Sequence, residues 1–131
     1  MTSHYFWLDE RIVRAMHADQ IARYGGSPGL RDQSLLSASL ARPQHLATYG
    51  QSSTLFDLAA AYGFGLTNNH PFIDGNKRTA FVVMATFLEL NGYTLVAPEP
   101  EVVGMMEDLA SGLVSQEQMS RWLESYCDVS Y

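Results

Sequence analysis

One stretch of nine residues, His70 to Arg78, places several side chains that can do chemistry in a single turn. It reads His-Pro-Phe-Ile-Asp-Gly-Asn-Lys-Arg, and so combines a base, a carboxylate and two cations with a glycine. Apolar helical runs lie on both sides, so the turn leads into a helix N-terminus, where free backbone N–H groups and the helix dipole favour an anion. These residue types together indicate transfer of a phosphorus-containing group.

The first half of the turn offers a base and a metal ligand, each with a structural alternative. His70 can accept the proton of an attacking hydroxyl, because histidine ordinarily titrates near neutral pH, whereas a lone histidine at a helix end would bond a carbonyl. Asp74 can hold Mg²⁺ through its oxygens, or it can simply cap the next helix. Phe72, between polar neighbours, is expected to anchor the turn on the core.

The second half of the turn suits a phosphate. Gly75 permits a positive φ and lets the backbone approach a phosphate closely, while Asn76 can tie the turn or donate to a phosphate oxygen. Arg78 suits bidentate phosphate binding and Lys77 adds a point charge, with a surface ion pair as the alternative for each. Two adjacent cations at a helix start oppose the helix dipole, so a bound anion is the better explanation.

The composition fits one globular domain over residues 1–131. Hydrophobic residues make up 47% and charged residues 17% of the chain. The formal net charge of −6 argues against direct nucleic-acid binding and leaves the basic turn to a small anionic ligand. The single cysteine, Cys127, is expected as a half-buried thiol on the last helix. Since neither a signal peptide nor a membrane span is recognisable, we expect a cytoplasmic location and no membrane partner.

Apolar spacing and helix-stop residues predict a compact all-α domain. Helices are expected over 8–24, 54–68 and 76–90, around 35–40 with an end before Pro43, from Pro100, and after a capping box at Ser115. The 8–24 helix should bury Leu8, Ile12, Ala15, Met16 and Ile21. Small residues in 54–68 and an almost wholly apolar 76–90 predict a central pair of buried helices joined by the turn. Residues 44–53 are expected to form a loop and 93–96 an extended segment.

The turn and its surroundings resemble the Fic/Doc family. Residues 70–78 fill every fixed position of the family motif His-x-Phe-x-Asp/Asn-Gly/Ala-Asn-Gly/Lys-Arg. Lys77 stands where most Fic proteins carry glycine, and in this it resembles the death-on-curing (Doc) branch. Segments 25–32, 41–43 and 87–93 agree with the family in the same order, so the resemblance covers roughly residues 5–95.

The resemblance implies a toxin of a toxin–antitoxin system, with ATP and Mg²⁺ as cofactors. It implies phosphoryl transfer to a hydroxyl side chain of a target protein, by analogy a translation elongation factor, and hence arrest of translation. The assigned residues are His70 as catalytic base, Asp74 as metal ligand, Gly75, Asn76, Lys77 and Arg78 for phosphate binding, Arg78 also in catalysis, and Phe72 as anchor. Lys77 favours phosphoryl transfer over the AMP transfer of the Fic branch. AMP transfer stays open as an alternative, and so does a non-catalytic binding module.

Three further segments have weaker assignments. Arg31 and Asp32 follow a Pro-Gly turn and could border the site, with a solvated pair at a helix start as the equal alternative. The 44–53 loop is the candidate for a short β-like flap that holds the target. Residues 120–125 nearly match the family's inhibitory motif but end in serine, so an ordinary amphipathic helix is the better interpretation. Restraint would then come from a separate antitoxin protein. His4, His17 and His45 receive no role.

Overall fold

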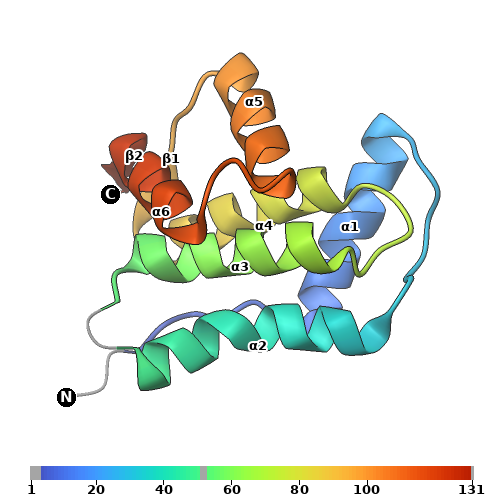
Figure 1. Ribbon diagram of the computed structural model, residues 1–131, viewed down its shortest axis with the longest axis horizontal. Coiled ribbons are helices and arrows are strands. Elements are labelled where there is room, and N and C mark those ends of the chain that lie inside the picture. Colours follow the sequence, from blue (N-terminus) through green and yellow to red (C-terminus); the bar gives the residue numbers. More distant parts are fainter. Residues whose placement is uncertain (1–3, 51–52, 131) are drawn as a thin grey trace.

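The chain folds around a central helix pair, α3 and α4 (Figure 1). The structure is a computed structural model and describes residues 4–50 and 53–130. In chain order its elements are α1 (Glu10–Tyr24), α2 (Gln33–Tyr49), α3 (Leu55–Asn69), α4 (Asn76–Leu90), β1 (Tyr93–Leu95), α5 (Glu99–Ala110), α6 (Gln116–Ser125) and β2 (Cys127–Val129). Helix α3 contacts α2, α4, α5 and α6, while α4 also contacts α1. The prediction of an all-α domain with a buried central pair is confirmed.

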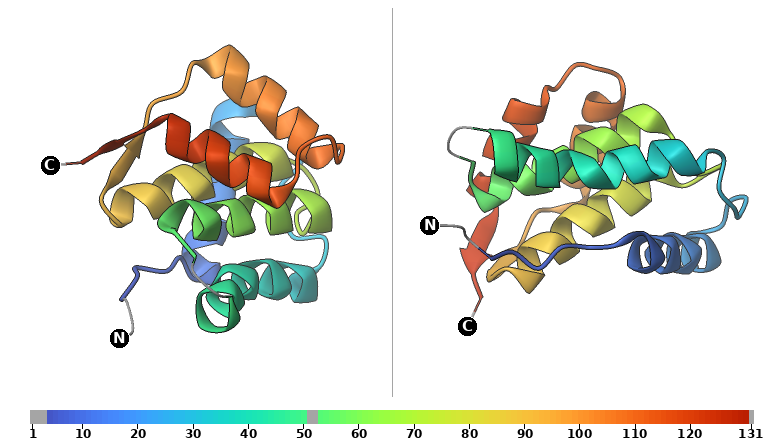
Figure 2. Two further views of the ribbon diagram at one scale, coloured as in Figure 1. Left: turned by 60° about the vertical axis from the view of Figure 1, so that its left-hand side comes forward. Right: turned by 90° about the horizontal axis from the view of Figure 1, so that it is seen from below.

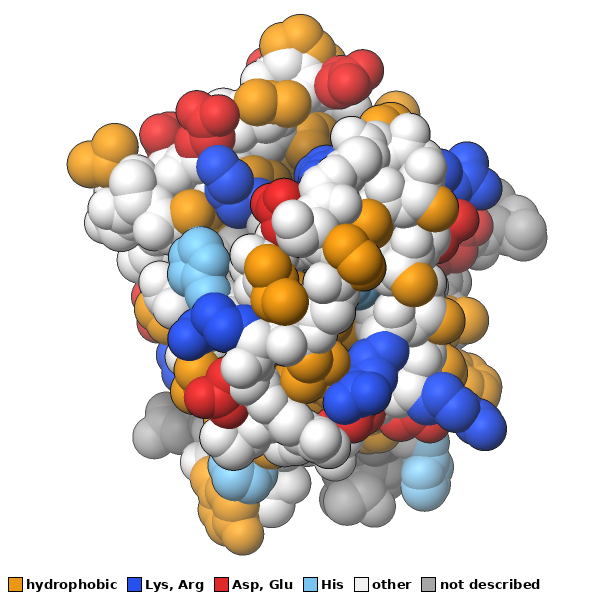
Figure 3. Space-filling model, turned by 90° about the vertical axis from the view of Figure 1, so that its right-hand side faces the viewer, with side chains coloured by type: hydrophobic (Ala, Val, Ile, Leu, Met, Phe, Trp, Pro, Cys, Tyr) orange, Lys and Arg blue, Asp and Glu red, His pale blue; other side chains and the backbone are white. Residues whose placement is uncertain are grey.

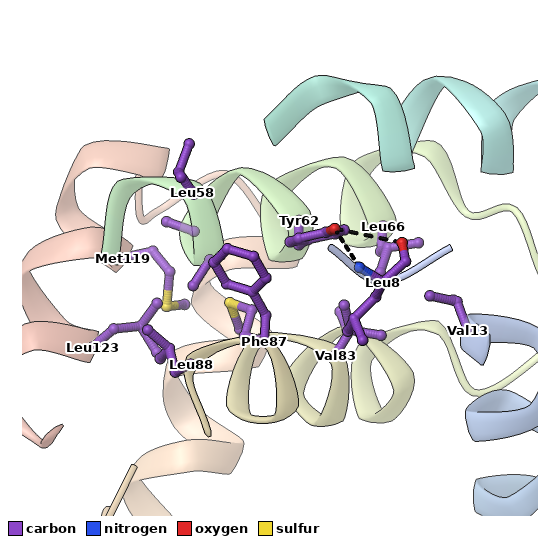
Figure 4. Packing of buried hydrophobic residues seen from close by; sticks show 14 of the residues in the cluster. Leu8, Val13, Leu58, Tyr62, Leu66, Val83, Phe87, Leu88, Met119 and Leu123 are labelled. Atoms are coloured by element: carbon purple, nitrogen blue, oxygen red, sulfur yellow. Dashed lines mark hydrogen bonds between the residues drawn. The ribbon is translucent and has the colours of Figure 1, made fainter. Parts of the chain in front are cut away.

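Helix α3 is buried on nearly all sides because small residues let its neighbours approach. A side chain at Gly63 would collide with the sulfur of Met84 on α4, and one at Gly65 would lie 3.2 Å from the Cα of Ser39 on α2. Tyr62, also on α3, is fully buried, and its hydroxyl is hydrogen-bonded to the backbone N–H of Leu8 at 3.0 Å (Figure 4). Burial raises the pKa of Tyr62 to about 12.

The first and last described segments both contact the C-terminal end of α4, far from the motif turn. Asn91, which ends α4, accepts from the Phe6 N–H at 3.0 Å and donates to the Phe6 carbonyl at 3.1 Å, so the segment before α1 is fixed there (Figure 2). Strands β1 and β2 pair antiparallel beside it, with Leu95 opposite Cys127. Cys127 therefore begins β2, and its predicted place on the last helix was wrong. Burial raises the pKa of the Cys127 thiol to about 11.

Helix α2 is longer than the sequence pattern predicts. Residues 44–49 are helical and Pro43 lies buried inside α2, so the predicted helix end before Pro43 and the predicted loop were both wrong. Proline removes one backbone donor from a helix, but here its ring belongs to the buried face of α2, which lies against α3. Helix α2 ends at the opposite side of the molecule from the turn (Figure 1). The end of α2 is therefore too far from the turn to form the flap that was predicted for residues 44–53. Residues 51 and 52 of that loop lie outside the described part.

Helix α1 turns a different face to the core than predicted. Helix α1 buries Val13 and His17, whereas Ile12 is 42% exposed and Leu8 is buried just before the helix begins. Helix α5 buries Met106 and Leu109 and ends before Leu113. The capping box at Ser115, the helix over 76–90 and the extended segment at β1 are confirmed. In the described part of the chain, no helix has the length and apolarity needed to cross a membrane.

Candidate active site

The motif turn connects the C-terminal end of α3 to the N-terminal end of α4. His70 ends α3 with φ 46° and ψ 57°, and it is the one non-glycine residue with a positive φ in the described part. That conformation is unfavourable for a residue with a Cβ and is found where surrounding contacts enforce it. Here Arg31 donates from Nε to the His70 carbonyl at 2.6 Å and from Nη2 to the Asn69 carbonyl at 2.7 Å. A cation therefore caps the carbonyl end of α3 and fixes the backbone of His70.

The segment from residue 25 to residue 32 runs antiparallel to the turn and holds its backbone. The Arg31 N–H donates to the Pro71 carbonyl at 2.7 Å, and the Ile73 N–H donates to the Gly29 carbonyl at 3.1 Å. Arg31 and Asp32 were predicted as residues that could border the site, and the loop that carries them does border the turn. The Arg31 side chain contacts the turn, whereas the Asp32 side chain caps α2 by accepting from the Leu35 N–H at 3.0 Å.

Phe72 is the anchor that its sequence context predicts, and His17 is its partner. Phe72 is 2% exposed, and the His17 ring stacks on it with a centroid distance of 3.8 Å and an interplanar angle of 6°. His17 is 4% exposed and donates from Nε2 to the Asp74 carbonyl at 2.8 Å. The sequence left His17 without a role. Its only local signal is its place four residues after Val13, on the buried face of α1.

Asn76 ties the turn together. Its amide nitrogen donates to the Phe72 carbonyl at 2.9 Å, its amide oxygen accepts from the Phe72 N–H at 3.0 Å, and the residue is 7% exposed. The same Nδ2 lies 3.4 Å from Nδ1 of the exposed His70 ring, and in this long contact Nδ1 is the acceptor, because an amide nitrogen can only donate. Of the two roles considered for the Asn76 side chain, the structure shows the structural one. Phosphate binding stays a prediction that concerns its backbone N–H.

Asp74 presents an exposed carboxylate beside the start of α4. Oδ2 accepts from the Ser27 N–H at 3.2 Å and Oδ1 accepts from the Gly75 N–H at 2.9 Å. These backbone hydrogen bonds lower the pKa of Asp74, so it is ionised at neutral pH. A side chain at Gly26 would come within 2.8 Å of Oδ2, which shows how closely the 25–32 segment approaches. Asp74 does not cap α4, because that helix has no side-chain cap.

The donor set around Asp74 fits Mg²⁺ bound together with a nucleotide. The described residues contain no group of three His, Cys, Asp or Glu side chains that could hold a metal ion alone. Mg²⁺ characteristically uses one or two protein carboxylates and completes its shell with phosphate oxygens and water. Asp74, ionised and placed at an anion-binding helix end, meets that requirement.

The N-terminus of α4 is open to an anion. Gly75 precedes it with φ 75° and ψ 18°, and no side chain accepts from the first turn. Lys77, the only lysine of the 131 residues, is exposed there. Arg78 is half-buried and donates from Nη2 to the Gly25 carbonyl at 2.9 Å. In the described part of the chain neither cation forms a salt bridge, so the ion-pair alternative is not realised.

An apolar groove of about 590 Å³ begins beside these two cations and runs between α4 and α5. Its lining includes Tyr24, Phe81 and Val82 together with the α5 residues Val102, Val103 and Met106. The almost wholly apolar sequence of α4 predicts a helix that is buried all round, but the groove leaves one side of α4 open. Phe81 and Val82 face the groove and are only half-buried.

The charged surface around the turn is discontinuous. Figure 3 shows this side of the molecule, with Lys and Arg side chains at several separate places among hydrophobic and neutral atoms.

Helix α6, which carries the near match to the inhibitory motif, lies away from the turn. The Ser120 hydroxyl donates to Asp57 at 2.6 Å, near the start of α3. The interpretation of α6 as an ordinary amphipathic helix agrees with this position.

Fold and turn together define the class: a helical domain in which the motif turn of residues 70–78 joins two central helices at an open helix N-terminus. The chain belongs to the Fic/Doc family, since the family described as "Fic/DOC family" matches residues 7–88. "Protein kinase doc" of Escherichia phage P1 is 36% identical over 101 residues, which cover 77% of this chain and 79% of the relative. "Toxin Doc" of Mycolicibacterium smegmatis is 41% identical over 113 residues, or 85% of this chain and 82% of the relative. These relatives support a toxin of a toxin–antitoxin system as the general role and a transferase as the general class.

Proposed function

We propose that this protein is a Doc-type toxin that transfers the γ-phosphoryl group of ATP to a hydroxyl side chain of a target protein. The observation that carries the proposal is the uncapped N-terminus of α4, which follows the turn that carries the exposed side chains of His70 and Asp74. Phosphoryl transfer depends mainly on positioning and charge stabilisation, and this arrangement provides both.

In the proposed reaction His70 accepts the proton of the target hydroxyl as its oxygen attacks the γ-phosphorus. The new oxygen–phosphorus bond forms while the bond from the γ-phosphorus to the bridging oxygen breaks, and ADP leaves with that oxygen. The first N–H groups of α4 and the side chains of Lys77 and Arg78 stabilise the charge on the phosphate oxygens. Mg²⁺ held by Asp74 would neutralise phosphate charge, without which the carboxylate would repel the nucleotide.

AMP transfer is the second candidate, because it would use the same base, metal ligand and cations on the α-phosphorus. Two observations favour the γ-phosphorus. Lys77 occupies the position where most Fic proteins have glycine, and the relative from phage P1 carries the name protein kinase. By the family analogy the target would be a translation elongation factor, whose modification would arrest translation.

The groove beside Arg78 is the proposed contact for a separate antitoxin. Its lining is mostly apolar, and at one end it reaches Lys77 and Arg78. Those features suit an amphipathic segment with an apolar face and one carboxylate directed at Arg78. Such a segment would compete with nucleotide phosphate for the same guanidinium, which is how a partner chain could restrain the enzyme.

Transfer from ATP labelled at either the α or the γ position tests the proposed chemistry. The purified protein is incubated with a bacterial lysate and Mg²⁺, and labelled proteins are detected on a gel. We expect label from the γ position only, its loss with His70→Ala, and its retention with His45→Ala on the exposed side of α2. Label from the α position alone would replace phosphoryl by AMP transfer. No label from either position, with toxicity that survives His70→Ala, would establish the binding module instead.

A further inference from the structure

We propose that His17 is a positioning residue for this site, which orients the Asp74 carboxylate through a single peptide plane. His17 comes from α1, more than fifty residues before the turn in the sequence, and its ring lies between α1 and the turn. The proposal rests on the proposed function only in that Asp74 is assigned to the metal–nucleotide complex.

The first step is the hydrogen bond between the imidazole and the backbone. Nε2 of His17 lies 2.8 Å from the Asp74 carbonyl oxygen, and since a carbonyl can only accept, the nitrogen carries the proton. His17 is 4% exposed, so water does not compete for this bond. A buried hydrogen bond of this kind is costly to break, because both partners would lose solvation without a replacement.

The second step runs through the peptide that joins Asp74 to Gly75. A peptide unit is planar and trans, so fixing the direction of its carbonyl also fixes the opposite direction of its N–H. That N–H belongs to Gly75 and donates to Oδ1 of Asp74 at 2.9 Å. The imidazole therefore determines where the carboxylate is held, although it touches neither carboxylate oxygen in a hydrogen bond.

The third step is the ring stack, which explains why a histidine suits this position. The His17 ring lies nearly parallel to the Phe72 ring, with a 3.8 Å centroid distance. Phe72 in turn exchanges hydrogen bonds with the side chain of Asn76 through its backbone. One residue thus contacts the apolar anchor with its ring face and the metal-binding end of the turn with its ring edge.

Gly75 lies beside the His17 ring and the Ile21 side chain. An added Cβ at Gly75 would make an ordinary contact with Nε2 of His17, at 3.7 Å, and a tight one with the Ile21 side chain, at 3.1 Å. The glycine also starts α4 in a left-handed conformation, with φ 75°, which a side chain would disfavour.

Two substitutions separate the donor from the ring. His17→Phe keeps an aromatic ring against Phe72 but removes the donor, whereas His17→Gln keeps a donor at a comparable reach but removes the ring. His45→Phe, at an exposed position of α2, is the matched control. His17→Leu replaces His17→Phe as the variant without a donor if the latter does not fold.

The first measurement needs no enzymatic activity. Backbone amide signals of Ser27 and Gly75 report on the two hydrogen bonds to the Asp74 carboxylate, and both are followed by ¹⁵N NMR. We expect both signals to move in the variant without a donor and to stay near their wild-type positions in His17→Gln and His45→Phe. Unchanged signals in a folded variant without the donor would overturn the proposal.

The second measurement is the Mg²⁺ concentration that gives half-maximal phosphoryl transfer. Losing a partner that orients a metal ligand characteristically weakens metal binding by about 10–100-fold, and we expect a rise of at least about tenfold for the variant without a donor. A merely structural His17 would lower the unfolding temperature and leave this Mg²⁺ concentration unchanged. If the wild type transfers no phosphoryl group, the proposed function fails, while the amide signals still decide the role of His17.

Discussion

Helices α3 and α4 lie side by side in the core, and they begin in opposite ways. Helix α3 begins with a complete capping box: the Thr54 hydroxyl accepts from the Asp57 N–H at 3.2 Å, and the Asp57 carboxylate accepts from the Thr54 N–H at 2.8 Å. Helix α4 begins after Gly75 with no side-chain cap at all. The same backbone groups are thus satisfied within the chain at one helix and left available at the other.

The comparison indicates how this fold separates stability from function. At α3 the capping residues stabilise the helix directly. At α4 the stabilising contacts act on the turn before the helix, from Arg31, His17 and Asn76, so the amides themselves stay free. An open helix end in a rigid frame is ready to bind an anion without rearrangement.

The largest expected effect comes from closing the open end of α4. Gly75→Asp would place a carboxylate where phosphate is expected and force a side chain into a backbone with φ 75°. We expect kcat/KM for ATP to fall by at least about 100-fold, the scale of losing a principal charge-stabilising contact. Gly92→Asp is the matched control, because Gly92 also has a positive φ, 102°, with nothing within 4 Å of an added Cβ. Equal losses in both variants would point to backbone strain and not to the anion site.

A smaller loss is expected when the frame around the open end is loosened. Arg31→Ala removes both side-chain hydrogen bonds to the carbonyls at the end of α3 and frees the backbone of His70. We expect kcat to fall by about tenfold with little change in the KM for ATP, because the base is misplaced while the phosphate contacts remain. Steady-state kinetics of Arg31→Ala beside Arg14→Ala, an exposed arginine paired with Glu10, test this. A change confined to KM would contradict it.

Removing the cap of α3 should affect stability alone. Thr54→Ala leaves the first turn of α3 without its acceptor, and the free energy of unfolding should fall by about 1 kcal/mol. Ser115→Ala, at the other capping box, should cost a similar amount. Urea unfolding measures both, and phosphoryl transfer per folded molecule should equal that of the wild type. Reduced transfer in the Thr54 variant would mean that the two helix ends are coupled after all.

The smallest effect concerns how the Asp57 carboxylate at the start of α3 responds to acid. Burial alone would raise the pKa of Asp57, but hydrogen bonds from Ser120 and Thr54 outweigh it and lower that pKa below about 3.9, the ordinary value of aspartate. Its stabilising contribution is therefore present above the unfolded pKa and lost as the pH falls through the lower folded pKa. Thermal unfolding between pH 5 and 2 should depend less on pH in Asp57→Asn than in the wild type. A steeper dependence in the variant would refute the assignment.

Much of the turn and its two helices could be predicted from the sequence because the relevant signals are local. The boundaries of α4 follow from Gly75 before it and Asn91 after it, and Thr54 marks the start of α3. The anchoring role of Phe72 follows from an aromatic residue among polar neighbours. In each of these cases the residue and its partner lie within a few positions of one another.

What could not be predicted depends on partners distant in the chain. His17 looks like any polar residue on a surface helix until α1 is placed against the turn. Pro43 predicts a helix end, and only its burial beside α3 explains why α2 continues. Cys127 lies in a strand because β1 offers an edge beside it, which no pattern near the cysteine could indicate. Propensity was overruled at these positions by tertiary packing.

Lys77 allows selective chemical labelling of the motif turn. Because it is the only lysine and stands exposed at the second position of α4, a lysine-selective isotope or fluorophore label would report on this one turn. Amine-reactive probes and lysine-directed inhibitors would likewise react with Lys77 as the one lysine side chain, besides any N-terminal amine. The other basic residues, apart from histidine, are all arginine. A label on Lys77 would therefore report specifically on the helix end where a nucleotide is expected.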